Sequence, residues 1–130
     1  MHLLGAAIGW GAQKIKTELG PEVFFKDISL KKLKLLGVNF KCEGIISPSI
    51  SVCSGEVKDK EQRSMLVKEF VVRLTERVQH LVKHEKFPVV IGGDHSMAMG
   101  TWSGVTTGLN AEGQFGLIWF DAHMDAHLKE

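Results

Sequence analysis

The chain has 130 residues, of which 44% are hydrophobic and 24% are charged, and its formal net charge is +1. This length and apolar content suit a single domain with its own hydrophobic core. The near-zero net charge provides no long-range attraction to nucleic acid or to a membrane surface, so we expect neither as a partner.

The amino-terminal residues 1–11 are apolar, but they carry no basic segment and no clear cleavage site. They are also too short to span a bilayer, so we expect a first strand over about residues 2–9. The only two cysteines, Cys42 and Cys53, follow no metal-ligand spacing and are expected to be reduced thiols. Together these features predict a cytoplasmic protein.

Two further elements are expected before the middle of the chain. A helix is predicted over residues 21–36, because Pro21 suits a first helical turn. Residues 37–40 then lead into a second strand. Residues 44–58 are rich in Ser and Gly, and we expect them to form an exposed loop.

A long helix is predicted over about residues 60–86, where apolar side chains recur at helical spacing. This stripe indicates core packing, and it comprises Met65, Phe70, Val71, Leu74, Val78, Leu81 and Val82. His80 and His84 lie four residues apart on the same helix and could in principle hold a metal ion. Because no acidic third ligand is near them in sequence, we expect them to be surface histidines.

The segment that follows combines a buried strand with a polar turn. Residues 87–91 form a short apolar run typical of a parallel sheet, and two glycines then precede Asp94 and His95. These glycines allow a tight turn with close backbone approach. Alone, the turn fits an ordinary strand-to-helix connection in which Asp94 or Ser96 caps the next helix.

The next interval completes a βαβ unit. A helix is expected over residues 96–110, and residues 115–120 form another apolar run that predicts a parallel strand. Parallel strands present their carboxyl ends at one edge of the sheet, where the sites of open α/β folds lie. We therefore expect His95 and the residues after 120 to lie close together.

Residues 121–127 place a potential metal ligand at every second position. On an extended backbone, alternate side chains share one face, so two carboxylates and two imidazoles converge there. A buried core strand does not tolerate four ionisable groups, and a solvated acidic strand does not need histidine. The pattern predicts a metal site formed from Asp121, His123, Asp125 and His127.

Carboxylate and imidazole ligands without a thiolate favour Mn, Fe, Co, Ni or Zn, whereas Mg uses few protein ligands. More than four ligand groups, with Asp121 central enough to bridge, indicate a pair of metal ions. Two ions about 3.5–4 Å apart hold a bridging water at lowered pKa, which favours hydrolytic chemistry.

At this point the sequence resembles a known family. Gly92-Gly-Asp-His-Ser96 and Asp121-Ala-His-Met-Asp125 resemble the first two signatures of the ureohydrolases, the arginase, agmatinase and formimidoylglutamase family. Ile8-Gly-Trp-Gly11 and Leu19-Gly-Pro-Glu-Val23 resemble the family's first strand and its turn into the first helix. The resemblance implies a three-layer α/β/α sandwich with a parallel sheet, here truncated after the fourth strand.

The resemblance also implies roles for individual residues. His95 and Asp125 would bind the first Mn²⁺, Asp121 would bridge both ions, and His123 would bind the second. His123, Asp125 and His127 are expected to face the substrate. His127 stands where many arginases have Asn, so it could donate a hydrogen bond, supply charge or face solvent. The implied activity is hydrolysis of L-arginine to L-ornithine and urea by a metal-bridging hydroxide.

The family's later signature, Ser-x-Asp-x-Asp, has no match in the sequence. We therefore expect residues 1–130 to be the amino-terminal portion of a single ureohydrolase domain, with activity in the complete protein. The partner is expected to be a small guanidino substrate, and the complete protein a homo-oligomer. Two alternatives remain: an agmatinase or related guanidino hydrolase, and a non-catalytic remnant or interaction module.

Overall fold

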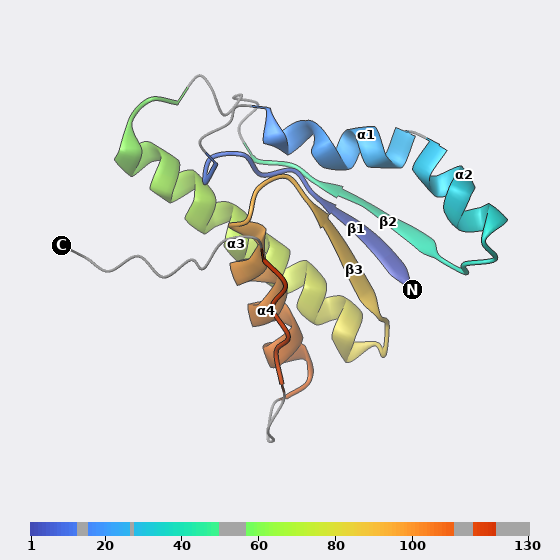
Figure 1. Cartoon of the computed structure of the whole chain (residues 1–130). Coiled ribbons are helices and arrows are strands. Elements are labelled where there is room, and N and C mark those ends of the chain that lie inside the picture. Colours follow the sequence, from blue (N-terminus) through green and yellow to red (C-terminus); the bar gives the residue numbers. More distant parts are fainter. Residues whose placement is uncertain (13–15, 27, 50–56, 111–115, 122–130) are drawn as a thin grey trace.

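The core of the protein is a sheet of three parallel strands with β1 in the centre. The computed structural model of the chain describes residues 1–12, 16–26, 28–49, 57–110 and 116–121. Strand β1 (His2–Ala6) pairs on one side with β2 (Lys41–Ile46) and on the other with β3 (Pro88–Gly92), giving the order β2-β1-β3. All three strands therefore end at the same edge of the sheet (Figure 1).

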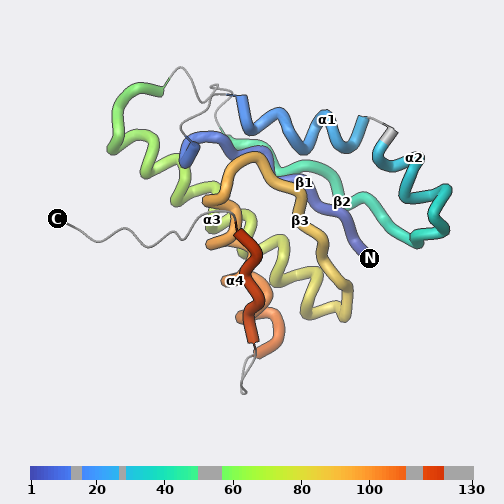
Figure 2. The backbone as a smooth tube through the Cα atoms, in the orientation of Figure 1, coloured from blue at the N-terminus to red at the C-terminus, as the bar shows by residue number. Residues whose placement is uncertain are grey.

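Helices cover both faces of this sheet. A 3-10 turn (Thr17–Leu19), α1 (Gly20–Lys26) and α2 (Ile28–Leu35) connect β1 to β2 on one face, and α3 (Lys60–Lys83) connects β2 to β3 on the other (Figures 1 and 2). Crossovers between parallel strands are right-handed, so two crossovers that move in opposite directions place their helices on opposite faces. The predicted α/β/α layering is confirmed.

Strand β1 contributes to both interfaces because its side chains alternate between the two faces. Leu4 and Ala6 belong to the core cluster on the α3 side. On the opposite face, a Cβ at Gly5 would lie 3.1 Å from the Cβ of Pro21, at the start of α1. The small residue thus lets α1 approach the centre of the sheet.

Helix α3 supplies most of the remaining core. It begins after Asp59, whose carboxylate accepts a hydrogen bond from the Gln62 N–H at 2.8 Å, a helix N-cap. Its buried residues lie three or four positions apart: Leu66, Phe70, Leu74, Val78 and Leu81. The predicted stripe is confirmed at Phe70, Leu74, Val78, Leu81 and Val82, whereas Val71 is only partly buried and lies outside the core cluster, and the first member was wrong. Met65 is 67% exposed, because it lies about 100° around the helix from Leu66.

Two other predicted boundaries differ from the structure. The single helix expected over residues 21–36 is divided into α1 and α2, and β2 extends into the expected loop as far as Ile46. Within that loop Val57 is buried in the core rather than exposed, and residues 50–56 lie outside the described residues. No helix among the described residues is long and apolar enough to cross a membrane.

The predicted fourth strand is not found. Residues 116–120 form no strand and pair with no part of the described sheet. They lie along α4 (Met97–Gly108) in Figures 1 and 2, and residues 118–120 line a cleft together with Met97 and Trp102 of this helix. An apolar strand in a parallel sheet needs cover on both faces. Contact with α4 covers only one side of this segment, and Phe120 is 94% exposed.

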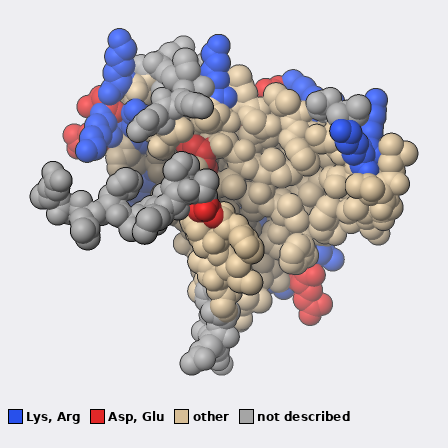
Figure 3. Space-filling view, in the orientation of Figure 1, with Lys and Arg blue, Asp and Glu red and all other residues tan. Residues whose placement is uncertain are grey.

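Helix α4 packs closely on α3 through three glycines spaced four residues apart. A Cβ at Gly100 would lie 2.9 Å from the Val71 carbonyl, and a Cβ at Gly104 would lie 2.6 Å from the Val78 Cβ. At Gly108 the distance to the Val82 Cβ would be 2.6 Å. The sequence of α4 has no charged residue, and Figure 3 shows an almost uncharged surface over it. Close contact with α3 therefore holds this helix in place.

We expect Gly104→Val to destabilise the protein by about 1–3 kcal/mol, because the added side chain overlaps Val78 and the Thr75 carbonyl. Urea unfolding followed by circular dichroism measures this change. Ser103→Val is the matched control, because Ser103 is exposed on the same helix and its substitution introduces the same β-branched side chain. Equal midpoints for the two variants would contradict the packing argument.

A group of charged side chains joins β1, β2 and α3. The Glu43 carboxylate lies 2.7 Å from His2 Nδ1, 2.9 Å from Arg77 Nη2 and 3.3 Å from Lys41 Nζ. The hydrogen bond with His2, followed by the interactions with Lys41 and Arg77, lowers the pKa of Glu43 below its ordinary value of 4.5 despite opposing desolvation. The ionised carboxylate therefore stabilises the folded state.

This shift predicts the pH dependence of stability. Because the folded-state pKa is lowered, the contribution of Glu43 is complete above pH 4.5 and is lost as the pH falls through the folded-state value. We expect Glu43→Gln to lower the free energy of unfolding at pH 7 and to flatten its fall below pH 4.5. Chemical denaturation across this pH range measures both effects, and exposed Glu69→Gln is the control.

Candidate metal centre

The turn after β3 lies directly against the exit of β1. The Gly93 N–H donates to the Ala6 carbonyl at 3.0 Å, and the Asp94 N–H donates to the Ile8 carbonyl at 2.9 Å. A Cβ at Gly93 would lie 2.0 Å from the Ile8 carbonyl oxygen, so only glycine fits this approach. The carboxyl ends of β1 and β3 thus form one platform.

Asp94 organises the turn that leads into α4. Its Oδ1 accepts a hydrogen bond from the Ser96 N–H at 2.8 Å and another from the Ser96 hydroxyl. Its Oδ2 accepts from the Gly11 N–H at 2.8 Å. Ser96 itself makes no side-chain capping bond. Of the two capping residues considered from sequence, Asp94 therefore binds the turn backbone.

The structure brings together two of the four predicted metal ligands. His95 Nδ1 lies 3.2 Å from Asp121 Oδ2, although the two residues are far apart in sequence. The imidazole also stacks on Trp119, with ring centroids 4.8 Å apart and planes inclined by 19°. The His95 side chain is 52% exposed, so one face of the pair remains accessible.

The geometry of this pair fits a shared metal ion. Ligand atoms about 2.0–2.2 Å from one ion, at right angles to one another, are about 3 Å apart. The nitrogen and oxygen donors of His95 and Asp121 have that separation. The other predicted site residues, His123, Asp125 and His127, lie outside the described residues. In the part of the chain that is described, no group of three or more potential ligands occurs.

The His95–Asp121 pair lies in a cleft of about 460 Å³. The cleft is bounded by the turn at residues 92–95, by the amino-terminal half of α4 and by residues 118–121. It is therefore large enough to admit a small organic molecule beside the pair.

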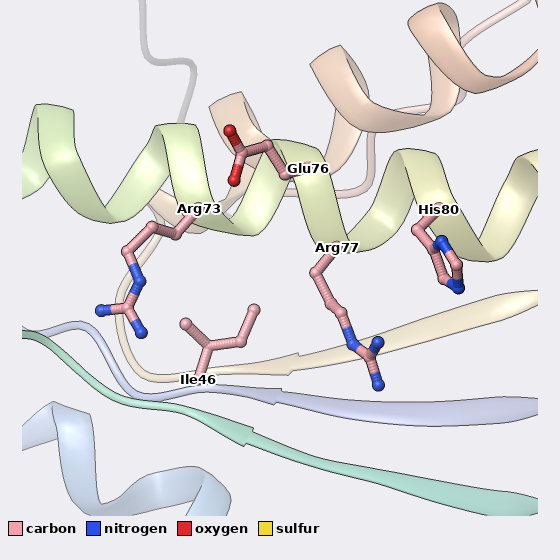
Figure 4. A pocket seen from close by; sticks show the side chains of 5 residues that line it. All are labelled: Ile46, Arg73, Glu76, Arg77 and His80. Atoms are coloured by element: carbon pink, nitrogen blue, oxygen red, sulfur yellow. The ribbon is translucent and has the colours of Figure 1, made fainter.

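A second cleft, of about 320 Å³, lies between α3 and β2 and is lined by Ile46, Arg73, Glu76, Arg77 and His80 (Figure 4). The guanidinium groups extend from α3 toward the strands, on either side of Ile46. Arg73 donates to the Ser47 carbonyl at 2.8 Å, and Arg77 binds Glu43. These contacts stabilise the fold, and no predicted site residue lines this cleft.

His80 and His84 are both exposed on α3, as predicted, with ring centroids 4.3 Å apart. His84 Nδ1 contacts the His80 carbonyl at 2.7 Å. They form no metal cluster with a third described residue.

Sequence reasoning did not identify three contributors to the candidate centre. Trp119 stacks on His95, Gly11 donates to Asp94, and Arg63 on α3 binds the carbonyls of Trp10 and Ala12. Gly11 belongs to the Ile8–Gly11 motif, which the sequence marks. For Trp119 and Arg63, no local signal indicates these partners.

The class of protein is an open parallel α/β fold in which an imidazole and a carboxylate lie side by side near the carboxyl edge of the sheet. The whole chain, residues 1–130, matches the arginase family. The chain therefore belongs to the arginase family, as its two signatures indicate.

Individual relatives agree with this assignment. An arginase of Staphylococcus aureus (strain COL) is 29% identical over 135 residues, covering all of this chain and 43% of that protein. An arginase of Bacillus subtilis (strain 168) is 27% identical over 130 residues, covering all of this chain and 42% of that protein. A formimidoylglutamase of Aeromonas hydrophila is 47% identical over 57 residues, 44% of this chain and 18% of that protein. The chain thus spans less than half the length of these relatives.

Solved structures confirm the fold. The crystal structure of arginase from Bacillus subtilis has a TM-score of 0.66 at 22% identity, covering 82% of this chain and 34% of that one. Arginase from Bacillus cereus has a TM-score of 0.64 at 24% identity, with the same coverage.

Proposed function

We propose that the chain is the amino-terminal part of a manganese-dependent ureohydrolase whose complete form converts L-arginine to L-ornithine and urea. The observation that supports this proposal is the contact between His95 and Asp121 at the carboxyl edge of the sheet. It joins the two signature segments of an arginase-family chain in one cleft.

In this proposal His95, Asp121, His123 and Asp125 hold two Mn²⁺ ions. When bound, the ions lower the pKa of a water molecule and so supply a hydrolytic nucleophile near neutral pH. Asp121 has two carboxylate oxygens and can serve both ions. His95 Nδ1 faces Asp121, and this orientation supports a shared metal ion between the two side chains. His123, Asp125 and His127 contribute the side chains that face the substrate.

The substrate is a small molecule with an amidine-type carbon. L-arginine is favoured by the arginases that match the whole chain. The formimidoylglutamase match, at higher identity over 57 residues, supports formimidoylglutamate as a second candidate. Agmatine is the third. We further propose a cytoplasmic homo-oligomer for the complete protein, with neither nucleic acid nor membrane as a partner.

We expect His95→Ala and Asp121→Ala to weaken Mn²⁺ binding at least about 10–100-fold, the range found even for residues that only support metal ligands. Electron paramagnetic resonance of free Mn²⁺ during titration measures the affinity. His84→Ala is the matched control, because it removes an exposed imidazole from α3. If neither His95→Ala nor Asp121→Ala changes the affinity for Mn²⁺, this metal centre is excluded.

We expect the complete protein, loaded with Mn²⁺, to release urea from L-arginine faster than from agmatine. Glutamate release from N-formimidoyl-L-glutamate is measured in parallel under the same conditions. Preferential glutamate release would assign the second candidate instead. Failure to turn over any of the three compounds would favour a non-catalytic role.

A further inference from the structure

Asp94 is the only buried polar or charged side chain among the described residues, with 8% exposure. Burying a carboxylate is costly unless hydrogen bonds replace its hydration. Asp94 accepts three such bonds, from Gly11 and twice from Ser96. Its burial is therefore fully compensated by these specific partners.

These partners belong to segments that are distant in sequence. Gly11 follows β1, and Ser96 precedes α4, so one carboxylate joins the two segments on either side of the candidate site. A Cβ at Gly11 would lie 3.1 Å from Asp94 Oδ1, which leaves little space for a side chain there. The contact is thus a close link between the two segments.

The segment around Gly11 is itself held by α3. Arg63 donates from Nε to the Trp10 carbonyl at 3.0 Å and from Nη2 to the Ala12 carbonyl at 3.1 Å. Trp10 is buried, with 3% exposure. Because α3 carries the main core stripe, Asp94 is linked through this segment to the helix that supplies most of the buried core.

We propose that Asp94 is a positioning residue that fixes the His95 imidazole for metal binding; the metal role itself rests on the proposed function. His95 lies between two anchored neighbours, since Asp94 is bound on one side and the Ser96 N–H on the other. This backbone holds the imidazole stacked on Trp119 and 3.2 Å from Asp121. Groups that orient a ligand affect metal affinity about 10–100-fold.

The test is Asp94→Asn, which preserves the size of the side chain. One carboxylate oxygen becomes an amide NH₂, which cannot accept a hydrogen bond from a backbone N–H or a hydroxyl group. The matched control is Asp59→Asn, because Asp59 also accepts a backbone N–H bond but caps α3 away from the cleft. We expect Asp94→Asn to weaken Mn²⁺ binding at least tenfold. Asp59→Asn should leave the affinity within twofold of the unsubstituted protein.

A second readout needs no metal. In the metal-free protein the stacked Trp119 indole shifts the NMR signals of the His95 ring protons. We expect Asp94→Asn to move these signals toward those of an unstacked histidine, and Asp59→Asn to leave them unchanged. If Asp94→Asn does not fold, Ser96→Ala removes one donor to the same carboxylate and should shift the signals in the same direction.

The two readouts separate the possible failures. The positioning role is overturned if Asp94→Asn changes neither the His95 signals nor the Mn²⁺ affinity. If Asp94→Asn cannot be purified, unchanged His95 signals in Ser96→Ala overturn it. Unchanged affinity with shifted signals would also overturn it, because the imidazole orientation would then not determine binding. If the unsubstituted protein binds no Mn²⁺ but its signals depend on Asp94, the proposed function fails while the orienting contact stands.

Discussion

The approach of Gly93 to the Ile8 carbonyl is the contact on which the candidate site depends. The backbone of the β3–α4 turn can lie this close to the exit of β1 only because Gly93 has no side chain. The approach aligns the hydrogen bonds to Ala6 and Ile8 and brings Asp94 within reach of Gly11. A larger residue at this position would separate the two strand ends and move His95 with them.

The same principle of close backbone approach orders the helical layer. The glycines of α4 allow its backbone to rest on α3, so the first turn of α4 lies at a defined distance from the sheet. This turn begins with Met97, which lines the cleft, and follows directly on Ser96, which binds Asp94. The packing of α4 on α3, away from the candidate site, therefore contributes to the position of the His95 side chain.

Much of this arrangement could be predicted from local sequence signals. The apolar runs of β1 and β3 and the helical periodicity of α3 predicted those elements correctly, because buried strands and amphipathic helices leave distinct patterns. The layered arrangement was implied by the resemblance to the family. His95 does lie beside Asp121 as expected, although the fourth parallel strand on which that expectation rested is not found. These features depend on residues that are near one another in sequence or on the general handedness of crossovers.

Other features depend on tertiary contacts that no local pattern encodes. In the sequence, Gly100 and Gly104 weaken the helix prediction, yet in the structure they permit contact with α3. The apolar run before Asp121 has the composition of a strand, but residues 116–120 lie along α4 instead, where residues 118–120 line a cleft with this helix. The composition of such a segment predicts that it is buried, but it does not specify which surface of the protein covers it.

The properties of the His95–Asp121 pair are compatible with the proposed ligand role. Ion pairs with exposed partners contribute only about 0–1 kcal/mol to stability, and His95 is 52% exposed. The hydrogen bonds that shape the turn come from Gly93, Asp94 and Ser96, so the His95 side chain is not needed to form it. A half-exposed imidazole that is oriented toward a carboxylate in a cleft has the chemistry that the proposed metal role requires.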